Sequence, residues 1–277
     1  MQHIIKSYLK FLWKSTNAHG VHSPFVFDLV RKCFYDNTNY SEYQVLENYR
    51  NSLLKNKSEI EVTDFGAGSR VFKSNKRQIS KIAQNAGIST KDAKHLFRIA
   101  KYFQPKTILE IGTSLGLATS ALAINNSAEI TTLEGCPETA KVAQLQFQNF
   151  NFNVNSIVTE FGSYFENCQL KSEHGQLIYF DGNHSKEATL NYFELLLPTI
   201  SNESVWIFDD IHWSKGMEEA WEIIKNHPKV SVTIDTFQWG IVFFRKEQEK
   251  EHFIIRTRKN FFLDTILGVK NLWGLIH

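Results

Sequence analysis

Short apolar runs alternate with longer segments of helical periodicity from residue 107 onward. Five of the runs are expected to form strands, at 107–111, 129–134, 154–159, 176–181 and 204–209. Helices are expected near 115–124, 137–149, 185–197 and 214–226. Strands that alternate with helices in this way predict a doubly wound α/β fold with a mostly parallel sheet.

Two further apolar runs follow the last of these helices. Val230 to Thr236 and Trp239 to Phe244 are separated only by Phe237 and Gln238. So short a connection joins antiparallel strands, because a parallel crossover needs about a dozen residues or more. The sheet is therefore expected to have seven strands, of which the last two form a hairpin.

The first 88 residues do not continue this alternation and are interpreted as an N-terminal helical extension. Ser23 and Pro24 are typical of a helix start, and an apolar helical face continues to Tyr35. A glycine-rich stretch at 66–70 is followed by basic residues. This stretch is interpreted as a hinge or as a lid segment that closes over substrate.

The chain is accordingly divided into three parts. Residues 1–88 form the extension, as a lid or substrate-binding region, and residues 89–246 form the core, which opens with a helix capped by Ser89 or Thr90. Residues 247–277 form an apolar and basic tail. Such a tail could lie on a membrane surface, but packing on its own domain or on a second copy in a homodimer is favoured.

Composition excludes several classes of protein. The 277 residues suit one α/β core with additions, and the net charge of +2 gives no indication of a nucleic-acid partner. Cys33, Cys136 and Cys168 are far apart and form no C-x-x-C pair, which argues against a zinc site or a disulfide framework and fits a reducing cytoplasm. No apolar stretch is long enough to span a bilayer, and no signal peptide is indicated.

The end of the first core strand carries the most informative motif. Glu110 stands near the end of the run 107–111, and Gly112 and Gly116 follow before the next helix. Ligands bind open α/β sheets at the carboxyl ends of the strands, and glycines let a ligand approach the backbone closely. The spacing differs from the dinucleotide pattern G-x-G-x-x-G, and Glu110 would repel a phosphate. A ligand with an amino group is favoured, although an ordinary strand–turn–helix corner would also give this pattern.

Glu134 occupies the corresponding place at the end of the second strand. A carboxylate at this position can accept hydrogen bonds from both hydroxyls of a ribose. The plainer alternative is an exposed acid at a strand end.

These motifs resemble those of class I S-adenosylmethionine-dependent methyltransferases, over residues 89–246. The resemblance implies a seven-stranded Rossmann-like fold that binds S-adenosylmethionine, with Glu134 on the ribose. After the third strand, Ser163 stands where many relatives have an acid that meets the adenine amino group. The cofactor-binding residues that the resemblance implies are Glu110, Gly112, Thr113, Ser114, Gly116, Glu134, Gly135, Gly162, Ser163 and Asp181.

Two further strand ends carry carboxylates. Asp181 follows the fourth strand, and Asp209 and Asp210 end the fifth, so the three are expected to converge on one crevice. Crowded carboxylates need protons, cations or water between them. A hard divalent ion such as Mg²⁺ or Ca²⁺ is one solution.

The same two segments resemble the catechol and caffeoyl-coenzyme A type O-methyltransferases. On this resemblance Asp181, Asp209 and Asp210 fall on metal-ligand positions, and His184 stands in place of the catalytic lysine. An imidazole with an ordinary pKa of about 6.5 can take the proton of an acceptor hydroxyl at neutral pH. His184 could instead cap the following helix, and His212 is a second candidate base.

Together these features predict a cytoplasmic, S-adenosylmethionine-dependent methyltransferase. It is expected to methylate a hydroxyl of a small molecule, with His184 as general base and Asp181 beside it. The alternatives are a metal-free N- or O-methyltransferase and a non-catalytic α/β binding module. The sequence does not indicate which molecule accepts the methyl group.

Overall fold

The computed structural model describes residues 2–63, 74–167, 176–258 and 264–265. The glycine-rich stretch at 66–70, Cys168 and most of the tail therefore lie outside the described residues. Within the described part, no helix combines the length and the apolar character that crossing a membrane would require.

A central eight-stranded sheet organises the chain, in the order β10-β8-β9-β7-β6-β3-β4-β5. Its strands are β3 (Thr107–Ile111), β4 (Glu129–Glu134), β5 (Asn155–Val158), β6 (Leu177–Phe180), β7 (Val205–Asp209), β8 (Val232–Asp235), β9 (Trp239–Phe243) and β10 (Glu251–Ile254). All neighbouring pairs are parallel except those of β9, which runs antiparallel to β7 and to β8. The predicted doubly wound, mostly parallel sheet and its final hairpin are confirmed.

The tail adds an eighth strand to the seven that the sequence predicts. Residues 251–254 pair in parallel with β8, and Phe253 is buried there. The backbone then meets the N-terminal segment, because Thr16 donates to the carbonyl of Ile254 and accepts from the amide of Arg256. The segment Glu-His-Phe-Ile is too short to show the alternation of apolar and polar residues that predicts a strand.

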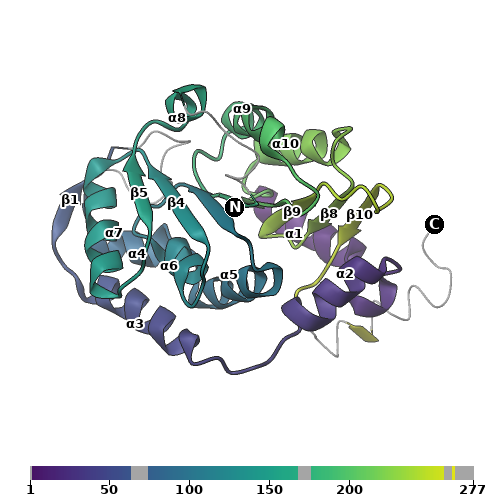
Figure 1. Cartoon of the computed structure of the whole chain (residues 1–277), viewed down its shortest axis with the longest axis horizontal. Helices are drawn as coiled ribbons and strands as arrows, with labels where there is room; N and C mark the ends of the chain where they lie inside the picture. Colours follow the sequence, from purple (N-terminus) through teal and green to yellow (C-terminus); the bar gives the residue numbers. More distant parts are fainter. Residues whose placement is uncertain (1, 64–73, 168–175, 259–263, 266–277) are drawn as a thin grey trace.

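Helices cover both faces of the sheet, as Figure 1 shows. The core helices are α5 (Thr90–Phe103), α6 (Leu117–Ala123), α7 (Pro137–Asn149), α8 (Phe161–Asn167), α9 (Lys186–Leu196) and α10 (Lys215–Asn226). Ser89 caps α5 as expected, since its side chain accepts a hydrogen bond from the amide of Asp92. The α8 turn after the third strand was not predicted, because its few residues show no helical period.

The N-terminal extension is helical and packs on the core. It contains α1 (Gln2–Lys14), α2 (Pro24–Leu29), a π-helical turn (Val30–Phe34), α3 (Glu42–Lys55) and α4 (Ile79–Asn85), with a hairpin of β1 (Glu59–Glu61) and β2 (Lys76–Gln78). The predicted helix start at Ser23 and Pro24 is confirmed, and Ser23 accepts from the amide of Val26.

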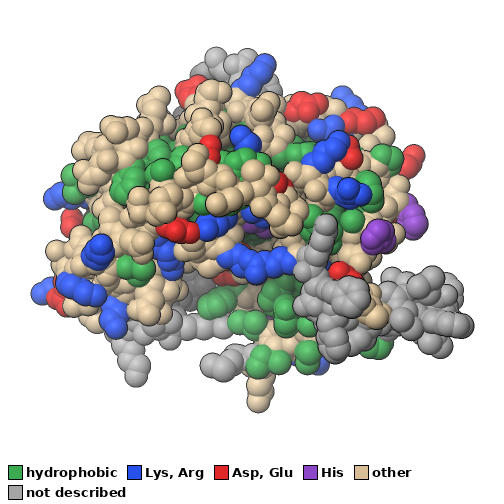
Figure 2. All heavy atoms as spheres, turned by 90° about the horizontal axis from the view of Figure 1, so that it is seen from below, with side chains coloured by type: hydrophobic (Ala, Val, Ile, Leu, Met, Phe, Trp, Pro, Cys, Tyr) green, Lys and Arg blue, Asp and Glu red, His purple; other side chains and the backbone are tan. Residues whose placement is uncertain are grey.

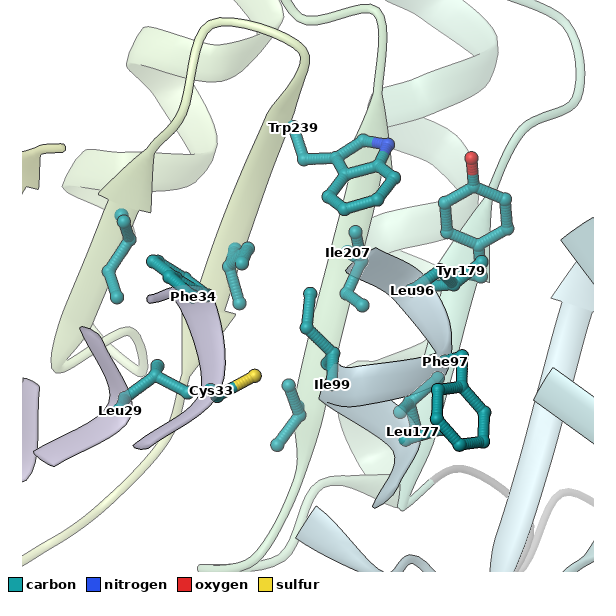
Figure 3. Packing of buried hydrophobic residues seen from close by; sticks show 14 of the residues in the cluster. Leu29, Cys33, Phe34, Leu96, Phe97, Ile99, Leu177, Tyr179, Ile207 and Trp239 are labelled. Carbon is teal, nitrogen blue, oxygen red and sulfur yellow. The ribbon is translucent and has the colours of Figure 1, made fainter. Parts of the chain in front are cut away.

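Apolar side chains that alternate along the strands fill two layers. On one face Leu96 and Ile99 of α5 pack with Tyr179, Ile207 and other sheet residues (Figure 3). On the other face of the sheet a second cluster joins α9 and α10 to the strands.

The surface of the molecule seen in Figure 2 carries lysine and arginine side chains across its middle and hydrophobic side chains near its lower edge.

Candidate functional site

A cavity of about 560 Å³ lies at the carboxyl ends of the parallel strands. Its size falls within the range of small-molecule sites, roughly 300–1,000 Å³. The segments after β3, β4, β5, β6 and β7 all contribute to its wall, and the N-terminal extension contributes Thr63, Arg77 and Asn85. The predicted strand-end crevice therefore exists, and the extension forms part of it.

Glu134 lies on the wall of this cavity, where its carboxylate is held by backbone amides. The amide of Ser114 donates to Oε2 at 2.6 Å, and the amide of Cys136 donates to Oε1 at 2.8 Å. Burial raises the pKa of Glu134, and these amides act in the opposite direction. Each carboxylate oxygen can accept a second hydrogen bond, so the fixed group fits a ligand that presents hydroxyl donors, such as a ribose.

Gly112 is required by the close approach of two strands. Its φ of +102° lies in the left-handed region, and a Cβ here would stand 2.6 Å from the carbonyl oxygen of Asp181. The glycine thus lets the end of β6 reach the loop after β3, and both lie on the cavity wall.

The space beside Gly116 is filled by side chains from other parts of the chain. Its φ is +77°, and a Cβ would meet the hydroxyl of Tyr49 at 2.4 Å and the ring of Phe147 at 2.6 Å. The residue does not line the cavity, so its lack of a side chain serves the packing of the extension and α7 against the loop.

Glu110 lies beneath the cavity rather than on its wall. It is fully buried, and the hydroxyls of Thr119 and Thr132 both donate to its Oε2 at 2.5 Å. Burial raises its pKa to about 7, against the effect of the two hydroxyls. Oε1 is buried and has no hydrogen-bond partner among the described residues.

Asp181 and His184 form the acidic–basic pair at the end of β6. Nε2 of His184 lies 3.5 Å from Oδ1 of Asp181. Burial alone would lower the pKa of His184, but the hydrogen bond and charge of Asp181, with Asp210 and Asp209, raise it to about 9. His184 is therefore an imidazolium at neutral pH in the free chain, whereas the sequence analysis assumed an ordinary pKa.

Asp209 and Asp210 are linked to each other through Gln238, which the sequence analysis placed only in the hairpin turn. The side-chain nitrogen of Gln238 donates to Oδ1 of Asp209 at 2.8 Å and to Oδ1 of Asp210 at 3.0 Å. Burial, followed by the charge of Asp181, raises the pKa of Asp209 well above its usual value. The hydrogen bond between Asp209 and Asp181 also raises the pKa of Asp209, and burial raises the pKa of both carboxyl groups.

The three aspartates are the expected metal ligands. Across the described residues, no group of three or more histidine, cysteine, aspartate or glutamate side chains is arranged to hold a metal ion. Oδ1 of Asp209 and Oδ1 of Asp210 both lie within 3.0 Å of the side-chain nitrogen of Gln238, and Oδ1 of Asp181 lies 3.5 Å from Nε2 of His184. A divalent cation held by these aspartates stays a prediction.

The structure brings most of the expected residues together and separates the others from the cavity. The cavity is lined by Gly112, Ser114, Glu134, Gly135, Asp181, His184, Asp209 and Asp210. Five expected residues do not line it, namely Glu110, Thr113, Gly116, Gly162 and Ser163. Thr113 is buried, where its hydroxyl lies 2.6 Å from that of Thr132.

Glu160 is the acid that the sequence analysis missed after the third strand. It lines the cavity and accepts hydrogen bonds from the amides of Gly162 and Ser163 at the start of α8. These amides and the Ser163 hydroxyl hold its pKa below the usual value. Its place at a strand end, like that of Glu110, Glu134 and Asp209, was the signal that would have identified it.

His212, the second candidate base, lies outside the cavity. Its Nδ1 and Nε2 are each 2.9 Å from a carboxylate oxygen, of Glu218 and Asp235 respectively. Its ring also stacks on Phe237 at 5.1 Å between centroids. With both nitrogens engaged, His212 ties the loop after β7 to α10 and β8.

Comparison with known proteins agrees with this arrangement. Residues 109–211 match the family described as a methyltransferase domain. No curated protein matches the chain. The matched segment begins within β3 and extends past β7, so it contains the carboxyl ends of the five strands at the cavity.

Solved structures show the same fold at low sequence identity. An O-methyltransferase from Bacillus cereus in complex with SAH is 18% identical, with a TM-score of 0.51, over 76% of this chain and 93% of that one. The O-methyltransferase TomG from Streptomyces achromogenes, involved in tomaymycin synthesis and solved with SAM, is 14% identical with a TM-score of 0.52, over 75% and 91%. A SAH-bound methyltransferase from Podospora anserina is 14% identical with a TM-score of 0.52, over 76% and 99%.

The expected resemblance to class I methyltransferases is confirmed by the domain match and by the fold. The eight-stranded, mostly parallel sheet flanked by helices is the Rossmann-like fold of these enzymes, with N-terminal helices added.

Proposed function

We propose that this chain, with its methyltransferase domain at 109–211 and its class I fold, is an S-adenosylmethionine-dependent O-methyltransferase of a small molecule. The observation that carries the proposal is the setting of Glu134. Its carboxylate is fixed by the amides of Ser114 and Cys136 on the wall of a cavity at the strand ends. If a ribose binds to Glu134, the rest of the ligand that contains this ribose would lie within the cavity.

The cofactor end of the proposed site consists of the loop from Gly112 to Ser114, with Glu134 and Gly135. This wall carries a carboxylate and no lysine or arginine at these positions, which favours a ligand without phosphate. When bound, the cofactor would supply an electrophilic methyl group on a positively charged sulfur atom.

The acceptor end of the proposed site consists of Asp181, His184 and the aspartates after β7. Because His184 carries a proton in the free chain, it must lose that proton before it can act as a base. A positive charge that enters a cavity beside His184 lowers its pKa, since the two charges repel. We assign His184 the task of releasing its proton on cofactor binding and then accepting the proton of the acceptor hydroxyl, while Asp181 orients the ring.

Ligand binding tests the cofactor assignment directly. S-adenosylhomocysteine should raise the unfolding temperature of the chain, whereas NAD should not. A ligand at about one hundred times its Kd stabilises a folded protein by about 2.7 kcal/mol. Stabilisation by NAD and not by S-adenosylhomocysteine would indicate an oxidoreductase and would overturn the proposal.

Proton release tests the role of His184. Calorimetry in buffers of different ionisation enthalpy should detect more protons released by S-adenosylmethionine, which is charged at sulfur, than by S-adenosylhomocysteine, which is not. The difference should disappear in His184→Gln. Equal proton release by the two ligands in the unsubstituted chain would contradict the assignment.

A further inference from the structure

Helix α1 exposes an unusual share of apolar surface. Seven large hydrophobic side chains are exposed among the described residues, and four of them belong to this one helix. These four are Ile5, Tyr8, Leu9 and Trp13. Single exposed apolar residues are ordinary on a protein surface, but several on one short helix mark an interaction site.

Ile5 and Leu9 form an outward stripe along α1. They are four positions apart and so lie on the same side of the helix, and they are 56% and 62% exposed. Ser7 and Phe11 lie on the opposite side and are buried. Phe11 contacts the ring of Phe237 at 5.5 Å between centroids, which fixes the direction in which the stripe faces.

A row of lysines runs beside the stripe. Lys6, Lys10 and Lys14 follow one another at four-residue intervals, and all three are exposed. No ion pair between described residues includes any of them. The helix contains no aspartate or glutamate.

We propose that α1 docks this protein on an anionic lipid surface, with Ile5 and Leu9 in the interface and the three lysines at the headgroups. An apolar stripe flanked by lysines is the pattern of helices that lie in the plane of a membrane interface. Long lysine side chains reach the charged headgroups while their stems stay on apolar surface. The charge of α1 complements that of anionic lipid.

A second copy of the chain fits this surface less well. A symmetric contact through the stripe would bring two rows of lysines to one interface, and α1 has no acidic residue to pair with them. Burying unpaired charges of one sign at an interface is unfavourable.

Vesicle flotation with the full chain tests the proposal. The protein should float with vesicles of equimolar phosphatidylglycerol and phosphatidylcholine, and it should stay in solution with phosphatidylcholine alone. Leu9→Asp should weaken partitioning about tenfold or more, because it places a charge in the apolar stripe. Replacing Lys6, Lys10 and Lys14 by glutamine should weaken it about fivefold for each lysine.

Leu145→Asp is the matched control, since Leu145 is 53% exposed but lies on α7. It should float like the unsubstituted chain, and circular dichroism should show that all variants remain folded. Equal flotation of Leu9→Asp and Leu145→Asp, or no binding to anionic vesicles, would overturn the proposal. So would a dimer without lipid that Leu9→Asp converts to a monomer, because a second copy would then cover α1.

Discussion

The hydroxyl of Tyr49 donates a 2.9 Å hydrogen bond to the carbonyl oxygen of Leu115. Tyr49 belongs to α3 in the N-terminal extension, and Leu115 belongs to the glycine loop after β3. Both residues are buried, and this hydrogen bond from the extension holds the backbone of the loop in place.

Tyr49→Phe removes this hydrogen bond while leaving the aromatic ring in place. It should lower the free energy of unfolding by roughly 0.5–1.5 kcal/mol, the usual contribution of one hydrogen bond. Chemical denaturation with urea measures the change. We also expect weaker binding of S-adenosylhomocysteine, and unchanged binding would show that the loop holds its shape without Tyr49.

Gly112→Ala should destabilise the chain by at least about 1–3 kcal/mol, the cost of holding a side chain in a left-handed backbone. The clash with the carbonyl of Asp181 adds to that cost. Gly216→Ala is the matched control, because no atom lies within 3.4 Å of its added Cβ and its φ is not positive. Gly216→Ala should be neutral or stabilising, and equal losses in both variants would refute the steric account of Gly112.

Glu134→Ala should weaken the binding of S-adenosylhomocysteine by roughly 1.5–3 kcal/mol, the scale of hydrogen bonds to a charged group. Isothermal titration calorimetry gives this number. Glu138→Ala serves as the control, since Glu138 is an exposed acid on the adjacent helix. A folded Glu134→Ala chain with undiminished affinity would remove Glu134 from the ribose site.

His184→Ala should reduce turnover by about 10²–10⁴-fold, as the loss of a general base does, with little change in the affinity for uncharged S-adenosylhomocysteine. Turnover is to be measured on an acceptor found by screening small hydroxyl compounds with labelled S-adenosylmethionine. Near-normal turnover in the variant would exclude His184 as the base. A collapse of cofactor affinity would instead show that His184 supports the cavity wall.

Folding stability should depend on pH through His184. Its pKa is about 9 in the folded chain, above the ordinary value near 6.5 that applies when the chain is unfolded. The folded state therefore binds this proton more tightly, and the stabilisation is fully present below about pH 6.5 and is lost as pH rises through about 9. Urea unfolding should show the difference between the unsubstituted chain and His184→Gln shrinking over this range, and a difference that stays constant with pH would argue against it.

The strand ends were predictable because apolar periodicity and acid placement are local signals. The runs that carry Glu110, Glu134 and Asp209 at or near their ends predicted their strands to within a residue or two, and with them the edge of the sheet where the cavity lies. Asp181 was found in the same way. Glu160 shares the pattern, but the resemblance places the expected acid at the position of Ser163.

The features that could not be predicted depend on contacts between distant parts of the chain. Nothing near Gly116 in the sequence indicates that Tyr49 occupies the space a side chain would need. The raised pKa of His184 depends first on Asp181, but also on Asp210 and Asp209, which lie at the end of another strand. From the sequence alone Glu110 is expected to bind a ligand. In the folded chain the hydroxyls of Thr119 and Thr132 donate hydrogen bonds to its carboxylate.

The position of β10 has a consequence for the order in which the chain is completed during synthesis. Every other strand of the sheet precedes β10 on the ribosome, so the outer edge of β8 remains unpaired until residues 251–254 emerge. An unpaired edge is a template for pairing with other chains. Ile254 and Arg256 then bond to the backbone of Thr16, which precedes every strand of the sheet, so this contact joins two segments that are far apart in the sequence.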